Sequence, residues 1–269
     1  MGNYLKLFIP PIVFLIPRVY SKIIKRIRPQ KTFDSYENSA LIDAIIEKTI
    51  IAKENIHKEK RINIDAFRIF VAMALGNCET KRIVDLGGAA GYHYFNAKRM
   101  HTSKELNWVI VETPLFCKKA KEISELSEIR FCDNVSDAFE TLSGEVDLVY
   151  CSRALQYFGD PFAILKEICS LSPKNIFISG IPESPDNQIH KHVQTSKMSD
   201  NGPQVHKGKS PNLGDVEYSL QLLPTNMIEE VLNAKYSIEL RIDEEPQAHI
   251  FKGQKIPFKG IWAVRRDIL

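Results

Sequence analysis

Residues 83–92 read IVDLGGAAGY, an apolar run that passes into a cluster of small residues. Small residues at such a turn let a ligand approach the backbone closely, and a helix that begins after them offers free N–H groups to a carboxylate. The dinucleotide-binding pattern G-x-G-x-x-G is not satisfied, because Ala89 stands two positions after Gly87. With Asp85 ahead of the glycines, the turn suits a cationic ligand that carries an amino acid better than it suits a pyrophosphate.

On the carboxyl side of this stretch, short β-branched runs alternate with stretches of helical periodicity. We expect strands at 82–86, 108–112, 129–132, 147–151 and 175–179, and helices that begin near Gly91, Pro114, Ser136 and Pro161. Apolar residues at helical spacing predict two further helices ahead of the first strand, at 38–54 and 64–75. Strands joined by helices imply right-handed crossovers, and hence a parallel sheet with helices on both faces.

The alternation stops after residue 179. Residues 180–224 are rich in proline and glycine and have little periodicity, which predicts a long irregular insertion that could serve as a lid or an acceptor site. Beyond it we expect a helix from Thr225, as N-cap, to Ala234, and then strands at 237–242 and 260–265 that pair as an antiparallel edge hairpin. The chain thus divides into an arm at 1–33, a helical lead-in at 34–78 and an α/β domain at 79–269.

The formal net charge of +3 hides an asymmetry along the chain. Residues 1–33 carry seven basic side chains and no acid, so the remainder has 29 basic against 33 acidic residues. A protein that grips phosphates needs a basic face, and no segment of this remainder is strongly basic. We therefore expect no nucleic-acid partner.

The arm combines an apolar run with a basic helix pattern. Residues 5–19 are too short to span a bilayer, are broken by prolines and precede no small-residue cleavage site, which argues against a signal peptide. Residues 19–28 place apolar and basic side chains on opposite helix faces. Two interpretations stay open: contact with an anionic membrane surface through residues 5–31, or packing of the apolar stripe on the domain or on a second subunit.

The five cysteines are scattered, odd in number and without a C-x-x-C pair: Cys78, Cys117, Cys132, Cys151 and Cys169. This usage is typical of reduced thiols in a cytoplasmic protein. We therefore expect the protein to lie in the cytoplasm, and to contact the inner face of the membrane if the arm binds there.

Polar side chains follow the second and third expected strands. Glu112 stands where an acid can accept both ribose hydroxyls, a constraint shared by NAD and S-adenosylmethionine sites. Asp133 and Asn134 suit an adenine amino group, although a helix N-cap role for Asn134 or Ser136 is equally open. The loop at 151–161, after the fourth strand, is long enough to form one wall of a ligand site.

Taken together, several motifs resemble one family. They are VDLGGAAGYHYF at 84–95, NWVIVETPLF at 107–116, RALQYFGDP at 153–161, HVQ at 192–194 and the stretch with a proline pair at 7–13. The chain resembles class I, Rossmann-like methyltransferases that use S-adenosylmethionine, and more narrowly a bacterial methyltransferase family associated with surface-polysaccharide gene clusters. Ala89 departs from the middle glycine of the general motif, whereas the narrower family resembles this chain in its double glycine.

The resemblance implies a mostly parallel seven-stranded sheet with an antiparallel terminal strand, an N-terminal helical extension and S-adenosylmethionine as cofactor. It also implies roles for matching positions. The methionine end of the cofactor would be held by Asp85, Gly87, Gly88 and Gly91, the ribose by Glu112, and the adenine would lie beside Asp133 and Asn134, with Ser152 near the sulfonium.

The acceptor is expected to be a small molecule or a glycan, methylated on oxygen during polysaccharide biosynthesis. A hydroxyl acceptor benefits from a general base, for which His192 and His190 are candidates, with Arg153 and Tyr157 as orienting groups. The spacing of His190, His192 and His206 is not specific for a metal, and none is expected. An NAD(P)-dependent oxidoreductase is disfavoured by the missing fingerprint and the edge hairpin. A noncatalytic module that binds a nucleotide-like ligand stays open.

Overall fold

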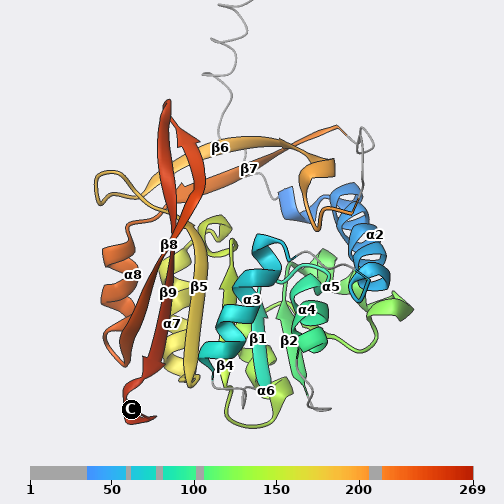
Figure 1. The fold of residues 1–269 in the computed structure, drawn as a ribbon, viewed down its shortest axis with the longest axis horizontal. Coiled ribbons are helices and arrows are strands. Elements are labelled where there is room, and N and C mark those ends of the chain that lie inside the picture. The colour runs from blue at the N-terminus through green and yellow to red at the C-terminus, as the bar shows by residue number, and fades with distance from the viewer. Residues whose placement is uncertain (1–34, 59–61, 77–80, 101–105, 206–213, 269) are drawn as a thin grey trace, which may run out of the picture. The chain divides into compact units, whose positions relative to one another are not determined.

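The computed structural model describes residues 35–58, 62–76, 81–100, 106–205 and 214–268. Within these residues a central sheet is formed by β1 (Arg82–Leu86), β2 (Asn107–Val111), β3 (Arg130–Cys132), β4 (Leu148–Ser152), β5 (Asn175–Pro182), β8 (Tyr236–Phe251) and β9 (Gln254–Arg265). The strand order is β3-β2-β1-β4-β5-β9-β8 (Figure 1). Strands β1 to β5 are parallel, and β9 pairs antiparallel with both β5 and β8. The predicted mostly parallel sheet with an antiparallel terminal hairpin is confirmed.

Helices cover both faces of this sheet (Figure 1). One face carries α2 (Ser39–Asn55), α3 (Ile64–Leu75), α4 (Tyr92–Met100) and α5 (Pro114–Lys121), and the other carries α6 (Val135–Leu142), α7 (Pro161–Leu171) and α8 (Thr225–Leu232). Side chains of each strand alternate between the two cores, so that Ile83 packs with the first group and Val84 with the second. Single 3₁₀ turns lie at η1 (Ser35–Glu37), η2 (Ser124–Leu126), η3 (Leu155–Tyr157), η4 (Met198–Asp200) and η5 (Arg266–Ile268).

Side-chain caps explain where several helices begin. Asn38 accepts a hydrogen bond from the Leu41 N–H at the start of α2, and Asn63 accepts one from the Ala66 N–H at the start of α3. Asp160 caps α7 ahead of a proline at the first helical position.

The N-cap predicted for α8 is wrong. Pro224 occupies that position, and Thr225 is the first helical residue. The backbone N–H and hydroxyl of Thr225 both donate to the carboxylate of Glu183, the first residue after β5. A carboxylate from elsewhere in the chain therefore does the capping that the threonine was expected to do.

The insertion at 180–224 is also more regular than predicted. Strand β5 continues to Pro182, and β6 (His190–Lys197) pairs antiparallel with β7 (Asp215–Leu222) to form a separate two-stranded sheet, here called the cap sheet. Figure 1 shows it lying across the carboxyl ends of the central strands. Strand β6 is polar on both faces and so has no apolar period, whereas β7 buries alternate residues from Val216 to Leu222.

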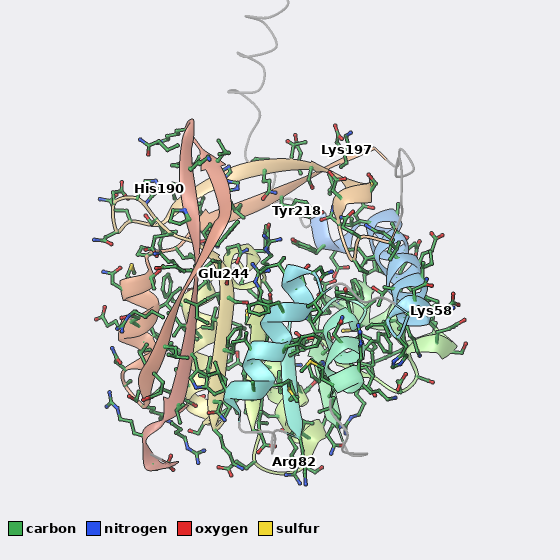
Figure 2. The ribbon with its side chains drawn as sticks, viewed as in Figure 1. Lys58, Arg82, His190, Lys197, Tyr218 and Glu244 are labelled. Carbon is green, nitrogen blue, oxygen red and sulfur yellow. The ribbon has the colours of Figure 1, made fainter. Side chains whose placement is uncertain are left out.

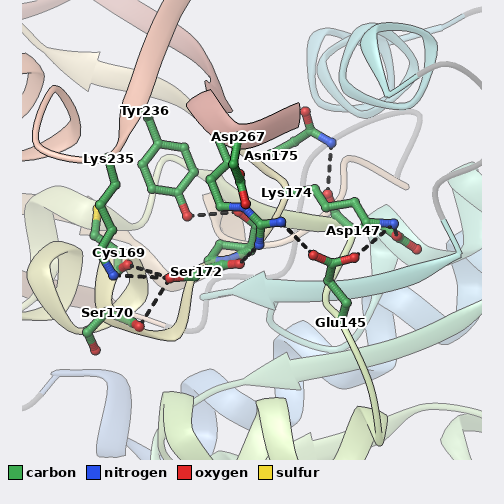
Figure 3. Close-up of polar contacts among 12 residues, drawn as sticks. Glu145, Asp147, Cys169, Ser170, Ser172, Lys174, Asn175, Lys235, Tyr236 and Asp267 are labelled. Atoms are coloured by element: carbon green, nitrogen blue, oxygen red, sulfur yellow. Dashed lines mark hydrogen bonds and ion pairs between the residues drawn. The ribbon is translucent and has the colours of Figure 1, made fainter. Parts of the chain in front are cut away.

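A polar network joins the strands at the end of the sheet where the parallel strands begin and β9 ends (Figure 3). Asp147 accepts hydrogen bonds from the backbone N–H groups of Lys81 and Arg82, and from the Lys174 ammonium, each at 2.9 Å. Glu145 accepts a bond of 2.7 Å from Arg265, at the end of β9. The network fixes β1, β4, β5 and β9 to one another at the end of the sheet opposite the glycine-rich turn.

The arm, including residues 5–31, lies outside the described residues, as do Cys78 and His206. The four described cysteines, Cys117, Cys132, Cys151 and Cys169, are free thiols. Among the helices that the structure describes, none has the length and apolar character required to cross a bilayer.

The last two strands form a long hairpin. In Figure 1 the tip of β8 and β9 projects beyond the cap sheet. The register between them shifts twice, once between Ile238 and Leu240 and again after Asp243. Strand β8 is the outer strand of the sheet on this side, and β3, only three residues long, is the outer strand on the other.

Candidate functional site

The glycine-rich turn packs tightly against the strands around it. Gly87 has a φ of 71° and Gly91 a φ of 90°, a region that favours glycine. A side chain at Gly87 would collide with Ala154 after β4, and one at Gly88 would collide with the carboxylate of Asp85. The turn therefore depends on glycine at the carboxyl end of β1, where open α/β sheets bind their ligands.

Asp85 supports this turn from beneath. Its side chain is wholly buried, accepts a hydrogen bond of 3.3 Å from the Trp108 indole and lies 3.1 Å from Nδ1 of His93. Burial acts to lower the pKa of His93, but the charge of Asp85 and its hydrogen bond outweigh it, and the pKa is raised. Asp85 thus links β1 to Trp108 of β2 and His93 of α4 directly beneath Gly88, and it does not line the cavity.

Glu112 joins the turn to the end of β2. Its Oε1 accepts the Ala89 N–H at 2.9 Å, and its Oε2 accepts the Thr113 N–H at 3.2 Å. Burial raises the pKa of Glu112 to about 7, although these two N–H groups act to lower it. A carboxyl group with such a pKa changes charge near neutral pH, so its ability to accept hydrogen bonds from a ligand depends on pH.

A cavity of about 360 Å³ opens at these strand ends. Its lining includes five of the residues predicted from the sequence, namely Gly87, Glu112, Asp133, Arg153 and Tyr157. A wider hollow of about 890 Å³ lies against the edge strand β3 and contains none of the predicted site residues. The smaller cavity is therefore the candidate site, because it combines the glycine turn with an acid of raised pKa.

Other predicted residues lie close to the cavity without forming its lining. Gly88 and Gly91 belong to the turn, and Ser152 is buried at the end of β4. The side chain of Asn134 accepts the Asp137 N–H at 2.8 Å and caps α6, so the alternative helix-cap role is the one observed. Asp133, its neighbour, faces the cavity.

The two candidate bases lie on the cap sheet and outside the cavity lining. His190 places Nε2 2.6 Å from a carboxylate oxygen of Asp186. His192 places Nε2 2.8 Å from Nε2 of His249, and burial lowers the pKa of His192. The cap sheet reaches the cavity further along β6, where Gln194 accepts a hydrogen bond of 3.3 Å from the Tyr157 hydroxyl.

Three tyrosines connect the cap sheet to the cavity. Tyr36 and Tyr157 line it, and Tyr218 of β7 packs on both, with ring centroids 4.9 Å and 5.8 Å away. Burial raises the pKa of Tyr36 well above its ordinary value, so the hydroxyl stays protonated. Such an aromatic wall suits the face of a ring.

Tyr36 and Tyr218 were not predicted as site residues. Tyr36 precedes the first helix, far from the glycine turn in sequence, and no local pattern marks it. For Tyr218 a signal existed, since the alternation of apolar residues around it predicts a strand. Figure 2 marks Tyr218 on the cap sheet.

Comparison with known proteins shows what this fold is similar to. No family model matches the chain, and neither does any curated protein. Among solved structures, an O-methyltransferase family protein from Burkholderia thailandensis matches over 94% of this chain and 70% of its own, at 15% identity and a TM-score of 0.51. The chain therefore has the Rossmann-like fold found in methyltransferases.

Two further matches have lower scores. An S-adenosylmethionine-dependent methyltransferase from Clostridium acetobutylicum covers 80% of this chain and 96% of its own, at 12% identity and a TM-score of 0.48. The N-terminal domain of EvdMO1, solved with SAH bound, covers 76% of this chain and 82% of its own, at 16% identity and a TM-score of 0.47.

Proposed function

We propose that this chain is a methyltransferase that uses S-adenosylmethionine. The observation that carries the proposal is Glu112, a half-buried acid at the end of β2 with a pKa of about 7, hydrogen-bonded to the glycine turn and lining the cavity. An acid at this position suits the two hydroxyls of a ribose. The cavity volume of about 360 Å³ lies in the range of small-molecule sites.

The residues present fit the cofactor that the motifs imply. Gly87, Gly88 and Gly91 have no side chains, so the backbone at these positions can hold the methionine end, and the Asp85 carboxylate packs against Gly88. Glu112 would accept hydrogen bonds from the ribose. Asp133 would lie beside the adenine with Asn134, whose side chain is already used to cap α6, and Ser152 would lie near the sulfonium.

When bound, the cofactor supplies a methyl group on a positively charged sulfur, and the charge disappears as the methyl group is transferred. The protein's main contribution is therefore to hold the acceptor in line and to exclude water. Tyr157 and Arg153 line the cavity and would orient the acceptor. His192 and His190 stay predictions as general bases, and the proposal does not depend on them.

The acceptor class that we propose is a small molecule or a glycan, methylated on oxygen during surface-polysaccharide biosynthesis. This part rests on the motif resemblance. We also propose that the enzyme is cytoplasmic and that the basic arm holds it at the inner face of the membrane. A membrane-bound acceptor would be made at that face.

Calorimetric titration with S-adenosylmethionine, S-adenosylhomocysteine (SAH) and NADH tests the cofactor. We expect the two sulfur compounds to bind and NADH not to bind. Glu112→Gln should weaken SAH binding by about tenfold or more, since hydrogen bonds to a charged group contribute roughly 1.5–3 kcal/mol. Glu230→Gln, at an exposed site on α8, is the matched control and should leave the affinity unchanged.

The other outcomes identify the competing functions. Binding of NADH alone would support an oxidoreductase and end the methyltransferase proposal. Binding of SAH without turnover on any glycan acceptor would favour a noncatalytic module. An unchanged SAH affinity in Glu112→Gln would remove Glu112 from the cofactor site.

A further inference from the structure

The backbone of Arg153 has an unusual conformation. It follows β4 with a φ of 57°, a left-handed conformation that few arginines adopt, and its N–H donates to the Ser179 carbonyl of β5 at 2.9 Å. Gly180, on the neighbouring strand, has a φ of 65°, and a side chain there would collide with the stem of Arg153. Two uncommon backbone conformations on adjacent strands thus make room for one basic side chain.

The guanidinium group, at the far end of the Arg153 side chain, also contacts an aromatic ring. Its central carbon lies over the Phe258 ring of β9, 5.2 Å from the ring centre, in a cation–π contact. Arg153 nevertheless stays exposed and lines the cavity. The backbone conformation and the contact with Phe258 both restrict where the cation can lie, which reduces the conformational entropy that is lost when an anion binds.

A second arginine, Arg68, lies near this corner. Arg68 of α3 is buried and forms ion pairs with Glu244 of β8 and, at 2.8 Å, with Asp65. The second oxygen of Glu244 accepts the Gly180 N–H at 2.7 Å (Figure 2 marks Glu244). Desolvation and the positive charge of Arg68 lower the pKa of Arg153, although Asp65 and Glu244 act to raise it. The corner thus contains two arginines, Arg68 and Arg153, and the two acids with which Arg68 forms ion pairs.

Two buried polar atoms in the same corner have no hydrogen-bond partner among the described residues. They are Oγ of Ser179, whose carbonyl holds Arg153, and Oε1 of Gln156, whose amide donates to the Gly180 carbonyl at 3.3 Å. At the opposite end of the cavity the lining residues Glu112 and Asp133 are acidic. The lining of the cavity therefore carries acids after β2 and β3 and one basic residue, Arg153, after β4.

We propose that Arg153 binds an oxyanion of the acceptor, a carboxylate or a phosphate, so that the methyl acceptor is an acidic molecule such as a sugar acid or a sugar phosphate. This inference rests on the proposed methyltransferase function. The cofactor's own carboxylate has the same chemistry, and the experiment must separate these two sources of the anion. Arginine suits either oxyanion because its N–H groups match carboxylate and phosphate geometry.

The test is a titration of SAH-saturated protein with D-glucuronate, inorganic phosphate and neutral D-glucose. We expect at least one anionic probe to bind and D-glucose to bind much more weakly. Arg153→Gln should weaken binding of the anionic probe by about tenfold or more and leave the Kd for SAH within about twofold. Arg153→Lys should restore part of the anion affinity. Arg241→Gln, an exposed arginine paired with Glu229, should change neither.

Each remaining outcome overturns the inference. If Arg153→Gln weakens SAH binding instead, Arg153 serves the cofactor carboxylate. If the wild-type protein binds SAH but does not prefer either anionic probe to D-glucose, the acceptor site is not selective for anions. If the wild-type protein fails to bind SAH at all, the proposed function itself fails, and the two failures are thereby distinguished.

Discussion

Ala89 has a left-handed backbone, with a φ of 49°, at the position where the general motif has its middle glycine. Its N–H is the donor that holds Glu112. The replacement of glycine by alanine therefore keeps the shape of the turn, at a cost of about 1–2 kcal/mol for a non-glycine residue in this region. The departure seen in the sequence does not alter the geometry on which the site depends.

At the scale of single residues, the pKa of Glu112, about 7, predicts how cofactor binding depends on pH. Hydrogen bonds from ribose hydroxyls favour the ionised carboxylate, so below pH 7 the free protein must lose a proton in order to bind. SAH affinity should thus fall as pH decreases below 7, by at most about tenfold per pH unit, and be nearly constant above it. Calorimetry over a pH series measures this change.

Glu112→Gln provides the control for this pH dependence, because an amide does not titrate. The variant should bind SAH more weakly, and its affinity should no longer change over this pH range. A wild-type affinity that stays constant as pH falls below 7 would contradict the assignment of the ribose to Glu112.

At the scale of elements, one buried ion pair connects three of them. Arg68 of α3 pairs with Glu244 of β8, and Glu244 also accepts the Gly180 N–H of β5. Both charged side chains are about 95% buried, with exposed fractions of 4% and 5%. Removing one partner leaves the other charged in a dry environment, which is costlier than losing the pair as a whole.

Arg68→Met should therefore lower the free energy of unfolding by about 3–5 kcal/mol. Arg241→Met is the matched control, because it breaks an ion pair with Glu229 in which the arginine side chain is 64% exposed, and it should cost less than about 1 kcal/mol. Urea unfolding of the three proteins measures the difference. An equal decrease in the free energy of unfolding in the two variants would show that the buried ion pair stabilises the fold no more than the exposed one does.

The elements differ in how well the sequence predicts them. The bounds of β1 and α3 agree with the apolar periodicity, because both bury a regular set of side chains against the core. The cap sheet was not predicted, since β6 consists largely of polar residues and its pairing with β7 depends on tertiary contacts. In the same way Glu112 and Asp133 could be found from strand ends, whereas Tyr36 reaches the cavity from a distant segment.

At the scale of the whole molecule, charge is concentrated in residues 1–33. If the arm binds an anionic membrane, replacing Lys22, Lys25 and Arg26 with glutamine should weaken binding to phosphatidylglycerol vesicles by roughly 100-fold, at about 1 kcal/mol for each residue. Replacing three exposed lysines of the domain, Lys118, Lys166 and Lys191, is the control and should have little effect. Vesicle co-sedimentation measures both, and equal partitioning would exclude membrane binding through the arm.

The two outer strands of the central sheet determine how readily it can pair with the sheet of another molecule. An outer strand with regular, unpaired backbone groups can pair with another molecule and start aggregation. Here β3 is too short to offer a long template, and the register of β8 is interrupted twice. The exposed charged side chains of Glu239, Arg241 and Asp243 on β8 would lose water if another strand paired there. The irregular hairpin therefore protects the sheet from edge-to-edge association while it closes the fold.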